Sequence, residues 1–128
     1  MRSRFETPFA ILTMAAALLH FGGETYYHVL YGQPFPAYLV DLIAIGMMLL
    51  ASGSSLVRRD VSSAGWLAAG WAFTVCLNYR SYFSRVYALE DGESLDEPST
   101  VLTILGATLV TNAIMLIVAM RLARPRRS

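Results

Sequence analysis

Long apolar runs alternate with short polar breaks along this chain, and four of the runs are long enough to cross a lipid bilayer as helices. A transmembrane helix needs about 20 mostly apolar residues to span a hydrocarbon core about 30 Å thick. The pattern therefore predicts four helices, at residues 8–31, 35–57, 61–87 and 100–120.

The breaks between the first three runs contain only a few residues each, Gly32-Gln33-Pro34 and Arg58-Arg59-Asp60. Connections this short join helices that are antiparallel neighbours, and open sheet edges are not tolerated in lipid. The sequence thus predicts an all-α membrane protein with one domain over residues 1–128. Its expected architecture is an up-down-up-down bundle of four transmembrane helices.

Composition agrees with this interpretation. Of the 128 residues, 55% are hydrophobic and 15% are charged, which is typical of a membrane protein and leaves no room for a separate soluble domain. The first run superficially resembles a secretory signal peptide, but it continues past Gly22 and Gly23 without an Ala-x-Ala cleavage pattern. We therefore expect it to be retained as a helix.

The basic residues are all arginine, and most lie in three clusters: before the first run, between the second and third, and after the fourth. These are Arg2, Arg4, Arg58, Arg59, Arg121, Arg124, Arg126 and Arg127. Basic connections stay on the cytoplasmic side, so both termini are expected there. The acidic connection at residues 90–97 then lies outside, most simply as a solvated connector.

This topology also bears on localisation and partners. The exclusive use of arginine suggests a GC-rich bacterial genome, so we expect a multi-pass protein of the inner membrane with the lipid bilayer as its main partner. Because topology already explains the basic clusters, no nucleic-acid partner is expected.

A polar stripe runs along the first predicted helix. At 100° per residue, His20, Glu24, Tyr27 and His28 fall on about one third of its circumference. Ionisable side chains are costly in hydrocarbon, so several on one face require an explanation. They form either a hydrogen-bond network that fixes helix register or a site for a ligand, substrate or proton.

The other helices add polar residues at similar depth, namely Asp41, Asn78 and Arg80. We predict that they line a polar pocket in the outer half of the bilayer together with the stripe. An arginine at that depth needs a carboxylate, so we expect Arg80 to pair with Glu24 or Asp41. The alternative is that Arg80, like Arg85, extends to the outer interface.

The sequence does not assign a cofactor. His20 and Glu24 lie one turn apart and could share an ion completed by Asp41, but the His-Glu-x-x-His and Glu-x-x-His motifs are absent, so no metal is predicted. His20 and His28 are about 12 Å apart along one helix axis, too far to ligate one haem iron together. Catalytic residues and cofactors are left open.

Three functions fit these features. The first is binding or transport of a small polar or amphipathic molecule, with proton coupling through Glu24 as an option. The second is an accessory subunit of a larger membrane complex. The third is a membrane-embedded isomerase or hydratase acting on a lipid-like substrate, so enzymatic activity stays open. A single four-helix unit has little interior, so a homo-oligomer or larger complex is expected.

Overall fold

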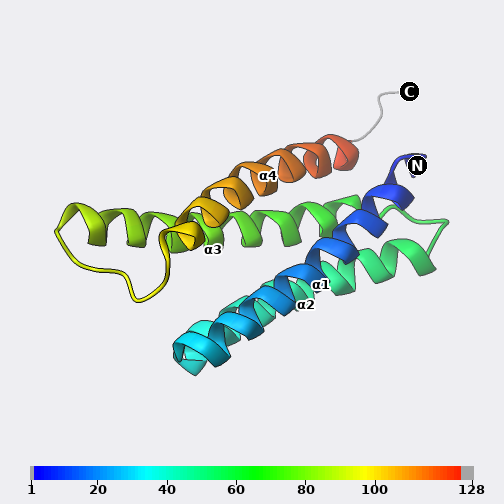
Figure 1. Cartoon of the computed structure of the whole chain (residues 1–128). Coiled ribbons are helices and arrows are strands. Elements are labelled where there is room, and N and C mark those ends of the chain that lie inside the picture. Colours follow the sequence, from blue (N-terminus) through cyan, green and yellow to red (C-terminus); the bar gives the residue numbers. More distant parts are fainter. Residues whose placement is uncertain (1, 125–128) are drawn as a thin grey trace.

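The computed structural model describes residues 2–124, and this part of the chain forms four α-helices (Figure 1). They are α1 (Glu6–Tyr31), α2 (Phe35–Val57), α3 (Ala64–Glu90) and α4 (Ser99–Ala123). The prediction of an all-helical chain with four helices is confirmed, and the bounds of α2 agree with those predicted. Arg126 and Arg127 lie outside the described residues.

Glycine and proline define the helix ends. Gly32 follows α1 with φ of 64°, a left-handed conformation that glycine adopts at little cost and that ends a helix. Pro34 and Pro98 directly precede α2 and α4 in extended conformations, with ψ of 137° and 151°. A proline lacks the N–H needed inside a helix but is tolerated at a helix start, so α2 and α4 begin directly after these residues.

The helices form two antiparallel pairs, α1 with α2 and α3 with α4, which are joined by packing between α2 and α3. Figure 1 shows the two pairs at an angle to one another. We call the end with the start of α1, the end of α4 and the α2–α3 connection the terminal end. The opposite end, which holds the α1–α2 turn and the α3–α4 connection, is the distal end.

The arrangement is open on the side between α1 and α4. Helix α4 packs against α3, and its buried residues are only Asn112 and Ala119. A groove of about 570 Å³ lies between α1 and α4 at the terminal end, with Phe9 and Leu122 among its lining residues. The predicted up-down-up-down order is present, but these four helices do not enclose a common interior.

The core lies where α1, α2 and α3 meet. Trp71 of α3 is buried and donates a hydrogen bond from Nε1 to Oγ1 of Thr13 at 3.0 Å. Gly70 allows close contact between α3 and α2, because a Cβ at this position would lie 3.2 Å from Cγ of Met48. Small residues at such crossings let helix backbones approach closely, which holds the two helix pairs together.

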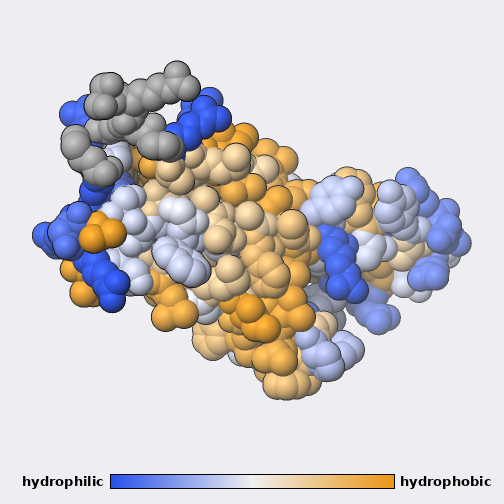
Figure 2. Space-filling view, turned by 180° about the vertical axis from the view of Figure 1, so that it is seen from behind, coloured by the Kyte–Doolittle hydropathy of each residue, from blue (hydrophilic) through white to orange (hydrophobic). Residues whose placement is uncertain are grey.

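Two helices, α2 and α4, are long and apolar enough to cross a membrane. Many large apolar side chains on the surface are exposed, including Leu19 at 78%, Leu50 at 75% and Val57 at 82%. Figure 2 shows hydrophobic residues across the middle of one face, with hydrophilic residues gathered toward the two ends. Exposed apolar surface of this extent marks contact with lipid or with another protein.

Candidate functional site

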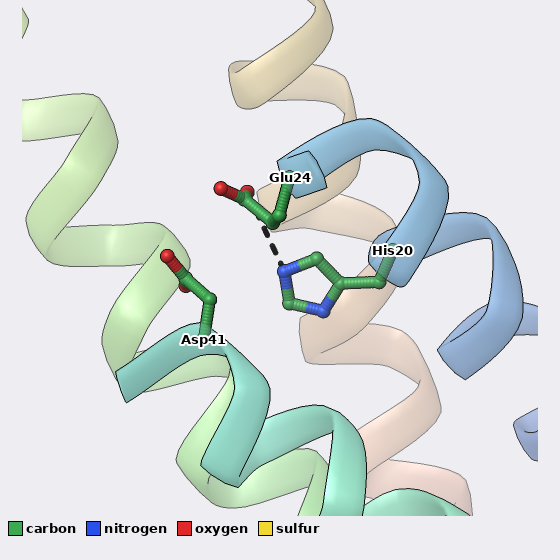
Figure 3. A group of neighbouring side chains, drawn as sticks. All are labelled: His20, Glu24 and Asp41. Atoms are coloured by element: carbon green, nitrogen blue, oxygen red, sulfur yellow. Dashed lines mark ion pairs between the residues drawn. The ribbon is translucent and has the colours of Figure 1, made fainter. Parts of the chain in front are cut away.

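Three predicted site residues meet between α1 and α2. His20 and Glu24 lie one turn apart on α1, and Asp41 faces them from α2 (Figure 3). One donor atom from each of the three lies within 4.8 Å of the other two. Nε2 of His20 is 3.5 Å from Oε1 of Glu24, and the two side chains are 23% and 24% exposed. We call these residues the His20–Glu24–Asp41 cluster.

Contacts one turn away hold the two helices in register at this cluster. The hydroxyl groups of Thr25 on α1 and Tyr38 on α2 are 2.7 Å apart and share a hydrogen bond. The ring of His28 stacks on that of Tyr38, with centroids 4.4 Å apart and planes inclined by 9°. Residues three apart share one helix face, so a fixed Tyr38 keeps Asp41 opposite α1.

The α1–α2 turn supplies a further contact to the cluster. Nε2 of Gln33 donates a hydrogen bond to Oδ2 of Asp41 at 3.3 Å. Oε1 of the same Gln33 is buried and has no hydrogen-bond partner within residues 2–124. A buried polar atom without a partner is uncommon in folded proteins. The amide of Gln33 therefore positions Asp41 and leaves an acceptor oxygen free.

Arginine does not neutralise the cluster, contrary to the sequence-based expectation for Arg80. In the described part of the chain, Arg80 is exposed and forms no ion pair. The sequence pattern does not determine which face of α3 packs against α1 and α2. In the structure Arg80 lies on the exposed face of α3. Glu24 and Asp41 therefore share one cluster whose basic member is His20.

Arg85 instead forms a separate network at the distal end. It donates hydrogen bonds to Glu97 of the α3–α4 connection and, at 2.8 Å, to the hydroxyl of Tyr27 on α1. The Tyr27 hydroxyl in turn donates to Oε2 of Glu97 at 3.1 Å. The network ties the α3–α4 connection to α1, so Tyr27 belongs here rather than to the His20–Glu24–Asp41 cluster.

Glu97 differs from the other acidic residues of its connection. Burial alone would raise its pKa, but the hydrogen bond and the positive charge of Arg85 outweigh that effect and lower the pKa below its ordinary range. By contrast, Glu93 and Asp96 are exposed. The expectation of a solvated connector thus holds for these two residues, while Glu97 is a structural anchor.

The remaining predicted site residues lie outside the cluster. Asn78 is half-buried and makes no hydrogen bond to His20, Glu24 or Asp41, and its Oδ1 has no partner among residues 2–124. His28 packs on Tyr38, and its Nδ1 is likewise buried without a partner. The groove between α1 and α4 contains none of the seven predicted residues. The convergence of polar groups is therefore local to α1 and α2.

Sequence reasoning missed Gln33, Tyr38 and Glu97 as members of these networks. The signal for Gln33 was available, since a long polar side chain in a three-residue turn lies close to the first turns of the next helix. Tyr38 gave no signal of its own, because tyrosine near the end of a membrane helix is common at the lipid–water interface. Glu97 had no local signal, because its contact depends on how the α3–α4 connection folds back.

The cluster has the atoms to hold a metal ion. A histidine nitrogen and two carboxylate oxygens are common ligands of divalent transition metals. The same groups also bind organic cations and exchange protons. Its chemical character is therefore that of a small, half-exposed site with an excess of negative charge when both carboxylates are ionised.

No known protein family matches the sequence, and neither a curated protein nor a solved structure is significantly similar to it.

Proposed function

We propose that this chain is a small integral membrane protein that binds a small positively charged solute at the His20–Glu24–Asp41 cluster and moves it across the membrane. In this proposal all four helices cross the bilayer, with the terminal end cytoplasmic and the cluster in the outer half. Proton coupling through Glu24 stays a prediction from the sequence.

One observation supports the proposal above all others: two carboxylates from neighbouring helices lie together, and no arginine among residues 2–124 pairs with them. Two like charges at close range in a poorly solvated place repel each other and each loses hydration. A bound cation relieves both costs. A purely structural role would favour full hydrogen bonding of these oxygens, as buried polar groups normally have.

The topology has its own support. Arg58 and Arg59 lie at the terminal end, which the positive-inside rule places in the cytoplasm. Helices α2 and α4 meet the length and apolarity needed to cross a membrane. Helices α1 and α3 are connected to them by short antiparallel turns, so a bilayer that contains α2 and α4 is expected to contain all four.

The experiment uses purified protein in detergent and in proteoliposomes, with a panel of tetraphenylphosphonium, methylammonium, Zn²⁺ and Mn²⁺. We expect at least one of these cations to bind saturably and to accumulate in the proteoliposomes. Asp41→Asn removes a charge with little change in volume and should abolish that binding. Asn78→Ala serves as a matched control, because Asn78 makes no hydrogen bond to the cluster.

Two results would contradict the proposal. Either none of the panel binds, or binding is the same in Asp41→Asn as in the unaltered chain. Measuring accumulation at two pH values with the same preparations tests proton coupling separately, because a coupled transporter responds to an imposed pH gradient.

An accessory subunit is the second candidate, and the exposure of α4 favours it. The main packing partner of α4 is α3. The side chains of Ile104, Val110 and Ile114 are therefore more than half exposed. In an accessory subunit this face would be covered by a larger partner, or by a second copy in a homo-oligomer. The purified chain would then aggregate in detergent, whereas a transporter should remain a monomer or a defined small oligomer.

A further inference from the structure

We infer that the preferred cation of the His20–Glu24–Asp41 cluster is a divalent transition metal of the zinc class. This inference rests on the proposed function, because it names the kind of cation that the same site takes. The three ligands would be Nε2 of His20, one oxygen of Glu24 and one oxygen of Asp41. The fourth position would be left for water or for an exchanging ligand.

The distances fit an ion of this size. Two ligand atoms each about 2.1 Å from a tetrahedral Zn²⁺ lie about 3.4 Å apart. The separation between Nε2 of His20 and Oε1 of Glu24 is 3.5 Å. The three donors lie within 4.8 Å of one another, so rotation of a carboxylate side chain brings the third ligand to the same distance.

The donor types distinguish this ion from other common metals. Mg²⁺ and Ca²⁺ prefer six or more oxygen ligands, which one nitrogen and two carboxylates do not provide. Cu⁺ prefers sulfur ligands, and the single cysteine, Cys76, is exposed on α3. One imidazole with two carboxylates suits Zn²⁺ and similar divalent transition metals. Zinc sites commonly use three protein ligands when a fourth position is kept open.

The surroundings of the cluster support the same ion. Gln33 fixes Asp41 through a hydrogen bond to Oδ2. Hydrogen bonds of this kind orient carboxylate ligands in metal sites. The second polar atom of Gln33, Oε1, is buried without a partner and would accept a hydrogen bond from a metal-bound water. The contacts of Tyr38 hold α1 and α2 in place before the ion arrives.

The experiment measures binding of Zn²⁺ to purified full-length protein that has been stripped with a chelator and held at constant pH. Calorimetry gives stoichiometry and affinity, and the visible absorption of bound Co²⁺ reports a tetrahedral site. We expect one ion per chain, with at least a hundredfold loss of affinity in His20→Ala and in Asp41→Asn. Asp96→Asn is the matched control, since Asp96 lies exposed in the α3–α4 connection and its substitution removes the same charge as Asp41→Asn, and it should bind as before.

Several outcomes would overturn the inference: no saturable binding of Zn²⁺, binding that survives His20→Ala, or an equal loss in Asp96→Asn. Helix content and unfolding of each variant are measured in parallel, and Glu24→Gln, which keeps side-chain volume, provides a second test if His20→Ala does not fold. If Zn²⁺ fails but an organic cation binds and depends on Asp41, the metal assignment is wrong and the proposed function stands. If no cation binds, both are wrong.

Discussion

Carboxylates in two regions of this protein differ in how deeply they are buried and in how many hydrogen bonds they accept. At the terminal end, Glu6 is fully buried and accepts hydrogen bonds from the Ser63 backbone N–H at 2.6 Å and from the hydroxyl groups of Ser62 at 2.9 Å and Ser55 at 3.2 Å. At the distal end, Glu24 and Asp41 are half-exposed, and the hydrogen bond to Asp41 from Gln33 is 3.3 Å long.

The difference teaches how to separate a structural carboxylate from one available to a ligand. Oxygens of Glu6 are satisfied by donors from α2 and the α2–α3 connection, so this side chain fastens the start of α1. By contrast, Asp41 accepts a hydrogen bond from the Gln33 amide, and Glu24 lies 3.5 Å from Nε2 of His20. Two variants test this comparison, and a third extends it to Glu97, the carboxylate that pairs with Arg85.

The largest expected effect comes from Glu6→Ala. Removing this carboxylate leaves the buried Ser63 N–H and the hydroxyl of Ser55 without their acceptor, so we expect a loss of about 3 kcal/mol in the free energy of unfolding. Unfolding in mixed detergent micelles provides the measurement. Glu24→Gln is the control and should change stability by less than about 1 kcal/mol. Equal losses in the two variants would remove the distinction between the regions.

A smaller effect is expected from Gln33→Ala, which removes the hydrogen bond to Oδ2 of Asp41. Loss of a group that orients a ligand commonly weakens metal binding by about 10- to 100-fold, so we expect roughly a tenfold loss of affinity for Zn²⁺ with stability little changed. Ser84→Ala is the control, because its exposed hydroxyl bonds only within α3. Unchanged affinity in Gln33→Ala would show that Asp41 is positioned without this contact.

The smallest effect concerns acid stability and Glu97. Because Arg85 lowers the pKa of Glu97 in the folded protein, the ion pair stabilises the fold above the pKa of the unfolded state. This contribution disappears as the pH falls through the lower folded pKa. We expect Glu97→Gln to remove up to about 1 kcal/mol at neutral pH and to flatten the decline of stability in acid.

Unfolding at several pH values between neutral and about 3 tests this expectation. Glu93→Gln is the matched control, since Glu93 lies exposed in the same connection, and it should behave like the unaltered chain. If the stability of Glu97→Gln falls in acid as steeply as that of the control, groups other than Glu97 cause the pH dependence.

The helices were predictable from the sequence, because long apolar runs bounded by glycine, proline and arginine leave few alternatives. The start of α3 was placed at residue 61, three residues too early, because Ser62 and Ser63 are used to bind Glu6 rather than to begin the helix. Local pattern contains no information about such a distant partner.

The candidate site was predictable in part. His20, Glu24 and Asp41 were selected because ionisable groups are costly inside a membrane helix, and the structure brings these three together. The pairing of Arg80 with a carboxylate was wrong, since it required knowing which face of α3 is turned inward. Arg85 finds its partner in Glu97 only because the α3–α4 connection folds back over α3.

Arg2 connects the start of α1 to the α2–α3 connection at the terminal end. Arg2 donates hydrogen bonds to the carbonyl oxygen of Arg58 at 2.9 Å and to Oγ1 of Thr7 at 2.8 Å, close to where Glu6 is fastened. An affinity tag or fluorescent fusion that replaces the first residues of the chain would loosen the start of α1. Fusion partners are better placed after α4, because the side chains of Arg121 and Arg124 make no hydrogen bond to residues 2–124.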